Sequence, residues 1–316
     1  MRTAHPTYAP LPECIRGIGH GANSFAIEQT RRPQRSTGMD DKQLQKALTF
    51  QALHQRDELL VLPNPWDAGS AKILAALGFE ALATTSAGLA FALGRPDGEG
   101  LISREETLAN ARAIVAATPL PVAADLENGF ADAPSGCADT LLQAAACGLV
   151  GGSIEDASGR VDAPIYPLEL AVERIRASVA AARSLPFPFT LCARAENFLH
   201  RRQDLRDTLK RLEAYAEAGA DVLYAPGLTT REQIDAVVRA VAPRPVNVLM
   251  GLPSIALTLD DLRELGVRRV SVGSSLARTA LGGFLRAARE LRRGSCDFAR
   301  DATSFAELND LFKAGQ

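Results

Sequence analysis

Acidic side chains gather in the middle of this chain, at the points where apolar runs end. Asp125 and Glu127 close one such run, Glu155 closes the next, and Asp97 lies in a long loop before them. Residues two apart on a strand point the same way, so Asp125 and Glu127 are expected to face one site. Carboxylates that converge must be protonated, paired or bound to a cation. All-oxygen ligands favour Mg²⁺ or Mn²⁺, so these four acids are candidate metal ligands.

An arginine stands among these acids. Arg194 ends an apolar run that is expected to be a strand, and a guanidinium there suits bidentate capture of a carboxylate or phosphate. The alternative is an ion pair with Glu155 or Glu196, which would replace the metal site by an arginine-paired network. A loop acid can also simply cap a helix. Substrate capture and ion pairing by Arg194 can coexist.

Several kinds of catalytic chemistry are excluded by residues that are missing. A Schiff-base aldolase needs a strand lysine, and every lysine falls on an expected helix. Of the four histidines only His200 could come near the acids, and a surface loop is the expected place for it. A zinc hydrolase built on histidines is therefore excluded. The chain has no G-x-S-x-G segment and no phosphate-binding P-loop.

Short apolar runs that alternate with amphipathic helices must position these side chains. The runs are nearly continuous in apolar residues, as in parallel strands buried on both faces. Eight such units in roughly 240 residues predict a (β/α)8 barrel, with the polar strand ends at its active face. A doubly wound open sheet is the alternative, but no G-x-G-x-x-G follows the first strand. The expected strands are Leu59–Asp67, Ala81–Ala87, Val122–Asn128, Val150–Asp156, Phe189–Asn197, Val222–Pro226, Val246–Gly251 and Arg269–Gly273.

Composition narrows the class of protein. The chain has 316 residues, 47% of them hydrophobic, and a net charge of -2. This is the profile of a globular protein with a full core, without the basic excess of nucleic-acid binding or a polybasic membrane anchor. No apolar run is long enough to span a bilayer. The five cysteines form no C-x-x-C pair, which argues against a disulfide framework and fits the cytoplasm.

The two ends differ from the barrel region. Residues 1–38 are rich in proline and glycine, with a basic run near their end, and are expected to be a disordered extension. A transit peptide is the alternative. Met39 is a candidate natural start, because the acids that follow it suit the first turn of a helix. Residues 39–294 then form the barrel, and 295–316 form a helical segment that includes a last helix from Ser304 to Lys313.

The strand ends, in this order, resemble the isocitrate lyase/phosphoenolpyruvate mutase superfamily over about Leu59 to Gly294. The likeness is strongest to its small bacterial members of methylisocitrate-lyase or phosphonomutase type. Six segments carry it: 63–67 (PNPWD), 84–88 (TTSAG), 93–97 (LGRPD), 124–129 (ADLENG), 153–156 (SIED) and 193–196 (ARAE).

The resemblance implies roles for these residues. Asp125 would bind Mg²⁺ directly, and Asp97, Glu127 and Glu155 would hold its waters. Most relatives have aspartate at this position, and Glu127 still supplies a carboxylate there. Arg194 would clamp the 2-oxo-acid part of the substrate, so Arg194, Glu155 and Asp97 are the candidate catalytic residues.

Substrate binding follows from the same resemblance. The hydroxyl and backbone N–H groups of Ser86, Ala87 and Gly88 would hold the substrate carboxylate. Asn247, on the seventh expected strand, is a further candidate substrate contact. The family implies a homo-oligomer, a dimer or tetramer, in which paired subunits exchange the last helix.

One loop departs from the family. Lyases of this superfamily carry a Lys-Lys-Cys-Gly-His segment after strand four, whose cysteine protonates the departing carbanion. Residues 157–164 here read ASGRVDAP, without Lys, Cys or His. Thr84 also stands where the lyases have tyrosine, so cleavage of methylisocitrate itself is not expected. The loop lysine of the mutases is missing too, and Arg160 and Tyr166 are the local candidates to supply a charge or a proton.

Three functions remain open. The first is a Mg²⁺-dependent lyase or decarboxylase that makes or breaks a C–C bond beside a small 2-oxo or 2-hydroxy acid. The cation would stabilise the developing enolate. The second is a phosphonate enzyme, a mutase or hydrolase. The third is a non-catalytic protein that binds 2-oxo acids.

Overall fold

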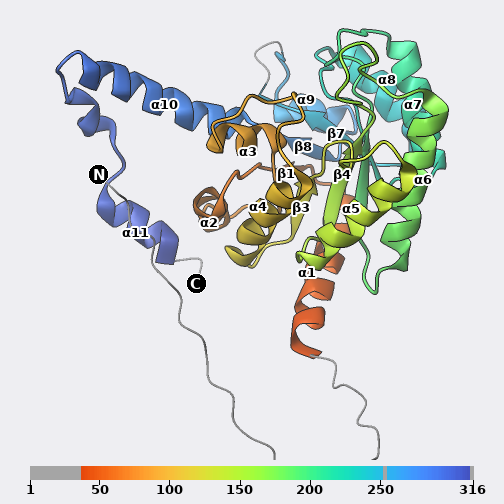
Figure 1. The fold of residues 1–316 in the computed structure, drawn as a ribbon, viewed down its shortest axis with the longest axis horizontal. Coiled ribbons are helices and arrows are strands. Elements are labelled where there is room, and N and C mark those ends of the chain that lie inside the picture. Colours follow the sequence, from red (N-terminus) through yellow and green to blue (C-terminus); the bar gives the residue numbers. More distant parts are fainter. Residues whose placement is uncertain (1–36, 252–254, 314–316) are drawn as a thin grey trace, which may run out of the picture. The chain divides into compact units, whose positions relative to one another are not determined.

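Eight parallel strands form the centre of the molecule (Figure 1). The computed structural model describes residues 37–251 and 255–313. Residues 1–36 of the expected N-terminal extension therefore lie outside the described residues. The strands are β1 (Leu60–Leu62), β2 (Leu82–Ala83), β3 (Val122–Asp125), β4 (Gly151–Glu155), β5 (Thr190–Arg194), β6 (Val222–Tyr224), β7 (Val246–Leu249) and β8 (Arg269–Ser271).

The strands close into a barrel. They follow the order β1-β8-β7-β6-β5-β4-β3-β2, and β1 pairs in parallel with β8. Between β1 and β2, the two ends of this order, the backbone N–H of Ala83 in β2 donates to the carbonyl of Pro63 just after β1, at 3.1 Å. A first strand paired with the last one rules out the open, doubly wound sheet and confirms the predicted barrel.

Helices alternate with the strands and surround them (Figure 1). Some of them begin with a capping box, such as Asp67 before α2 with Ser70 in its first turn, and Ser103 before α4 with Glu106 in its first turn. The helices are α1 (Thr37–Gln55), α2 (Ala68–Ala76), α3 (Ser86–Ala92), α4 (Arg104–Ala116), α5 (Pro134–Ala146), α6 (Leu168–Ser184), α7 (Leu205–Glu217), α8 (Arg231–Val241), α9 (Leu259–Glu264), α10 (Ser275–Arg292) and α11 (Phe305–Lys313).

Each strand is found where it was expected but ends earlier. The expected second strand ran to Ala87, yet Thr85 caps a short helix, α3, that begins at Ser86. The third strand ends at Asp125, so the expectation that Asp125 and Glu127 lie on one strand is wrong. Glu127 has φ +48°, a left-handed backbone that no strand accommodates. Loops take over at the strand ends because the strands diverge at the mouth of a barrel.

The barrel interior is apolar at most positions and polar at a few. Buried alanine, valine, leucine and isoleucine side chains fill the space between strands and helices. Near β8 the guanidinium of Arg269 is buried, and its Nε donates to Asn247 Oδ1 at 2.9 Å. Its Nη1 lies 3.4 Å from Nε2 of His54, a buried residue of α1. The prediction of nearly continuous apolar runs thus did not include these polar contacts between β7, β8 and α1.

Helix α10 completes the eighth βα unit, and α11 lies outside the eight units. Helix α10 continues from β8, and α11 contacts α2 of the same chain. The last helix was expected from Ser304 and begins at Phe305. Within residues 37–251 and 255–313, no helix combines the length and apolar character needed to cross a membrane. The described cysteines, Cys137, Cys147, Cys192 and Cys296, are all free.

Candidate active site

Arg194, the last residue of β5, binds three carboxylates at once. Its Nη1 lies 2.8 Å from Asp125 Oδ1, and its Nη2 lies 3.0 Å from Glu155 Oε2. Its Nε lies 2.9 Å from Glu196 Oε1. Parallel pairing sets this up, because Glu155 and Arg194 are register partners on β4 and β5. The structure therefore confirms the ion pairing that the sequence offered as an alternative for Arg194.

Asp125 at the end of β3 is the best-stabilised acid of this cluster. Its Oδ2 accepts hydrogen bonds from the hydroxyl of Ser86 at 2.8 Å and from the Ser86 N–H at 3.3 Å. Burial raises the pKa of this carboxyl, but the charge of Arg194 and the Ser86 bonds outweigh it and hold the pKa below its usual value. Asp125 is thus an ionised carboxylate at neutral pH.

The other acids are poorly compensated. Burial, together with the charges of Asp125 and Asp97, raises the pKa of Glu127 to about 7. Burial and Asp125 also raise the pKa of Asp97. The pKa of Glu155 lies well above its ordinary value because of burial, against the opposing pull of Arg194. With Glu196, five acids surround one guanidinium, so the cluster carries a surplus of negative charge.

A cation fits this surplus. In the part of the chain that the structure describes, no three His, Cys, Asp or Glu side chains are already arranged as a ligand set. The acids differ in how firmly they are held, however. Asp125 is fixed and ionised, whereas Glu127 and Asp97 lack a cationic partner of their own and are pushed toward protonation. A hard divalent cation held by one carboxylate directly and by others through water suits such a donor set.

The inner of two cavities lies at the barrel mouth beside Arg194 and has a volume of about 200 Å³. Of the expected site residues, Ser86, Ala87, Asp97, Asp125, Arg194 and Asn247 line it. Gly88 does not line it, since this residue is buried in α3 and its N–H donates to Thr85 Oγ1 at 3.2 Å. A Cβ at Gly88 would come within 2.5 Å of Thr85 Cγ2, so glycine there allows close packing of α3.

The floor of the inner cavity is made of polar side chains that bind one another. Asn247 is almost fully buried, and its Nδ2 donates to Ser271 Oγ at 2.9 Å while its Oδ1 accepts from Arg269. The Arg194 guanidinium lies 5.2 Å from the ring centroid of Tyr224, on the neighbouring strand. Both ends of the Asn247 amide are therefore engaged within the barrel, although the residue lines the cavity as expected.

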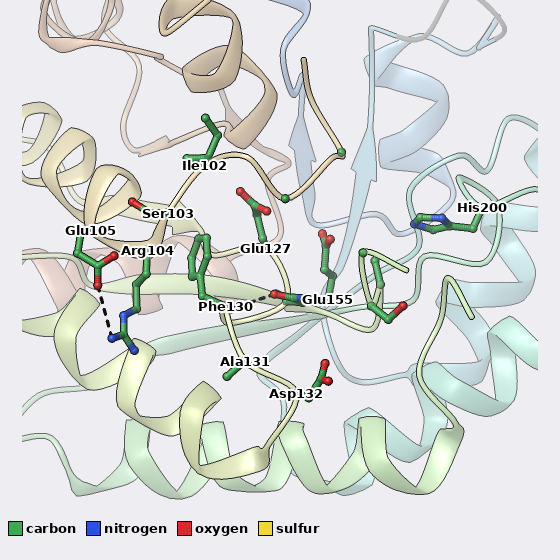
Figure 2. Close-up of a pocket in the computed structure, with 16 residues that line it drawn as sticks. Ile102, Ser103, Arg104, Glu105, Glu127, Phe130, Ala131, Asp132, Glu155 and His200 are labelled. Atoms are coloured by element: carbon green, nitrogen blue, oxygen red, sulfur yellow. Dashed lines mark hydrogen bonds and ion pairs between the residues drawn. The ribbon is translucent and has the colours of Figure 1, made fainter. Parts of the chain in front are cut away.

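The outer cavity, of about 600 Å³, opens on the other side of the acids. Figure 2 shows the carboxylates of Glu127 and Glu155 extending into it, with Phe130 nearby and His200 on the opposite side. Because Glu155 lines this cavity and binds Arg194 of the inner one, the charge cluster borders both cavities. The expected site residues are thus shared between the two cavities.

The loop after β4, which departs from the family, is pinned in place. Ala157 and Ile165 form an antiparallel bridge, and the Ser158 N–H donates to Pro164 O at 2.8 Å. Arg160 binds Asp132 at 2.8 Å and lies over the Tyr166 ring. Tyr166 is buried, donates its hydroxyl to Asp132 Oδ1, and has its pKa raised to about 12, chiefly by burial. Neither candidate from the sequence therefore offers a proton to the cavity.

A buried arginine holds the segment that carries Glu127. Arg174 of α6 donates to the backbone carbonyls of Asn128, Ala131 and Asp132. Its guanidinium also lies 4.1 Å from the Tyr166 ring centroid. The loop after Glu127 is thereby fixed although it lies outside any strand, which explains how a left-handed Glu127 keeps a defined position.

Sequence reasoning assigned Glu196 no role beyond pairing with Arg194, and it assigned Tyr224, Arg269 and His200 no role in the site. Glu196 was visible as a strand-end acid, two residues after Arg194. Arg269 was visible as a charged residue that opens an otherwise apolar strand. His200 was expected on a surface loop but is half-buried and lines the outer cavity. Tyr224 gave no signal, because an aromatic residue is ordinary in a buried strand.

Similar proteins identify the family of this chain. The family model described as phosphoenolpyruvate phosphomutase matches residues 50–292, most of the chain. The chain belongs to the isocitrate lyase/phosphoenolpyruvate mutase superfamily. The resemblance inferred from the strand ends is thereby confirmed. Members of this superfamily include lyases, mutases and hydrolases.

Individual members cover most of the chain. A crystal structure from Burkholderia cenocepacia J2315, described as that of a candidate lyase/mutase, is 58% identical. It superposes with a TM-score of 0.83 over 86% of this chain and 97% of its own. An uncharacterized protein of Mycobacterium tuberculosis is 34% identical over 78% of this chain and 90% of its own length. The 2,3-dimethylmalate lyase of Eubacterium barkeri is 30% identical over 70% and 77% of the two chains.

Proposed function

We propose that this superfamily member is a Mg²⁺- or Mn²⁺-dependent lyase or decarboxylase. Its substrate is a small 2-oxo or 2-hydroxy carboxylic acid, in which a C–C bond beside the oxygen-bearing carbon breaks or forms. The observation that carries the proposal is the surplus of acids around Arg194 at the strand ends. The similarity to a dimethylmalate lyase supports the same reaction class.

The acids divide into two roles toward the cation. Asp125 is the direct ligand, because Arg194 and Ser86 keep it ionised. Asp97, Glu127 and Glu155 would hold the cation together with Asp125, and its positive charge would lower their raised pKa values. When bound, the cation supplies positive charge to the oxygen of a developing enolate.

The remaining residues bind and orient the substrate. Arg194 points its guanidinium at the inner cavity and can turn one N–H from an acid to the oxo-acid part. Ala87 at the start of α3 lines the inner cavity and can offer its N–H to the substrate carboxylate, and the Ser86 hydroxyl can turn to it from Asp125. Gly88 contributes by letting α3 pack closely, and Asn247 by forming the floor of the cavity.

The test is an NMR screen of the purified protein with Mg²⁺ and then with EDTA. The panel contains oxaloacetate, methylisocitrate, isocitrate, dimethylmalate, phosphonopyruvate and phosphoenolpyruvate. We expect metal-dependent turnover of an acid without phosphorus, lost in Asp125→Asn and kept in Asp162→Asn, an exposed acid of the pinned loop. Turnover of the two phosphorus compounds would instead identify a phosphonate enzyme. Metal-dependent binding without any turnover would identify a binding protein.

We also propose that the protein self-associates through its C-terminal helices. Helix α10 buries only Ala277 within the described chain and exposes a set of large apolar side chains: Leu276, Leu281, Phe284, Leu285 and Leu291. Phe305 at the start of α11 is 90% exposed. Such a face is covered when paired subunits exchange or pack these helices. Light scattering should report a dimer or tetramer, and Phe284→Glu should lower its mass.

A further inference from the structure

The outer cavity needs a group that can move a proton, and most of its polar side chains are committed. Glu127 and Glu155 belong to the charge cluster. Asp132 binds both Tyr166 and Arg160, and the Ser158 hydroxyl donates to the Ala163 carbonyl. Ser103 caps α4. Of the described side chains that line this cavity, the imidazole of His200 has no such commitment, and an imidazole can both accept and donate a proton.

His200 is attached to the barrel through a short, well-braced turn. The N–H groups of Leu199 and His200 both donate to the carbonyl of Glu196, at 3.1 and 3.2 Å. Glu196 is itself fixed, because its N–H donates to Asp156 Oδ1 at 2.8 Å and its carboxylate binds Arg194. The position of His200 is therefore tied to the same residue that holds Arg194.

The segment that follows β6 packs against this turn. A Cβ at Gly227, just after β6, would lie 2.9 Å from Phe198 Cβ, so the two segments are in close contact. Figure 2 shows the His200 ring extending from its loop toward the side of the cavity where Glu155 and Glu127 lie. The imidazole thus faces the space that a substrate beside the acids would occupy.

The surroundings of His200 keep it neutral at rest. Partial burial lowers the pKa of the imidazole, the charge of Asp156 raises it, and Arg202 lowers it further. Glu127 and Glu155 face it across the cavity from the ends of β3 and β4. A neutral imidazole can accept a proton, and it can return one after protonation by solvent.

We propose that His200 transfers the proton to and from the carbon beside the carbonyl of the bound 2-oxo acid. This inference rests on the proposed function. For pyruvate, neutral His200 takes a proton from C3, the C–H electron pair forms the C2–C3 double bond, and the carbonyl oxygen becomes the enolate oxygen. The imidazolium then exchanges its proton with solvent and returns one to C3. In cleavage, the same group protonates C3 after the C–C bond breaks, in place of the family's missing loop acid.

The test uses pyruvate in D2O with Mg²⁺ and follows loss of the C3 proton signal by NMR. We expect wild-type protein to catalyse exchange and His200→Gln to slow it about 100-fold or more. Arg201→Gln is the matched control, because it removes an exposed charge from the same turn and should keep the exchange. Mg²⁺-dependent oxalate binding should change by no more than about threefold in His200→Gln, since only proton transfer is lost.

A second readout does not depend on turnover. The His200 ring protons, assigned by their absence in His200→Gln, should titrate with a different pKa when Mg²⁺ and oxalate are added. Unchanged exchange in His200→Gln would overturn the proposal, as would wild-type protein that binds oxalate but exchanges no pyruvate proton. Failure of wild-type protein to bind oxalate with Mg²⁺ would instead contradict the proposed function, and this inference with it.

Discussion

Arg194 and Glu155 stand opposite each other at the ends of β5 and β4, with Nη2 and Oε2 3.0 Å apart. Two other carboxylates bind the same guanidinium, so no single pair describes the interaction. A buried cation with three anionic partners organises the site, and the free energy of unfolding must depend on it.

Replacing Arg194 by methionine should therefore destabilise the protein strongly. The change leaves Asp125, Glu155 and Glu196 without their cation, and removal of one partner of a buried pair costs about 3–5 kcal/mol. Urea denaturation at pH 7 in EDTA measures this loss. Arg160→Met is the control, because that arginine is half-exposed in its pair with Asp132 and should cost less than about 1 kcal/mol. Equal losses in the two variants would contradict the assigned role of Arg194.

Glu127 should make the metal-free protein less stable as the pH rises. Its pKa is about 7 in the folded chain and 4.5 ordinarily. The unfolded chain therefore binds fewer protons between these pH values, and stability falls from pH 4.5 to 7 by up to about 3 kcal/mol. Thermal unfolding in EDTA should therefore show Glu127→Gln gaining stability relative to wild-type protein as the pH rises from 4.5 to 7, a difference that excludes the opposing effect of His54. Added Mg²⁺ should restore stability at pH 8 in wild-type protein, and a difference between the two proteins that does not change with pH in EDTA would refute the charge surplus.

His54 should make the protein sensitive to acid. Burial first, and then the charge of Arg269, lower its pKa from 6.5 to about 3. The unfolded chain takes up a proton below pH 6.5 that the folded chain refuses, so stability falls by about 1.4 kcal/mol per pH unit as the pH drops. His54→Gln should flatten the profile between pH 6.5 and 5 in urea titrations. An unchanged slope in that variant would show that another group is responsible.

Gly88 should tolerate no side chain. A Cβ would lie 2.5 Å from Thr85 Cγ2 and 3.0 Å from Trp66 Cβ, so Gly88→Ala must shift α3 and with it Ser86. We expect a loss of about 1–3 kcal/mol, the usual cost of overpacking, and weaker oxalate binding. Gly69→Ala is the control, because its Cβ would meet nothing nearer than 3.6 Å and alanine favours a helix. Calorimetry of both variants measures the loss of stability, and oxalate titration measures the loss of binding. Equal stability and binding in the two variants would contradict the prediction.

The barrel could be predicted from the sequence because its signals are local and repeated. Each unit is a short apolar run, which predicts a strand, followed by an amphipathic segment, which predicts a helix. Both patterns are recognised from neighbouring residues alone. The charged residues could be named for the same reason, since Asp125, Glu155 and Arg194 each end an apolar run. Strand ends of a barrel meet at one face, so their convergence followed from the fold.

The tertiary structure decided which of these side chains contact one another. Sequence spacing placed Asp125 and Glu127 on one strand, whereas Arg174, remote in the chain, holds the loop after Glu127 in another backbone state. Gly88 and His200 have other roles than the sequence predicted, for the same reason. Gly88 packs against Thr85, and Glu196 holds the turn of His200, and no local sequence pattern encodes such contacts. The sequence by itself determined the fold and the kinds of charge at its mouth. The partners and the protonation of each charge depend on burial and on distances between strands, which only the folded chain defines.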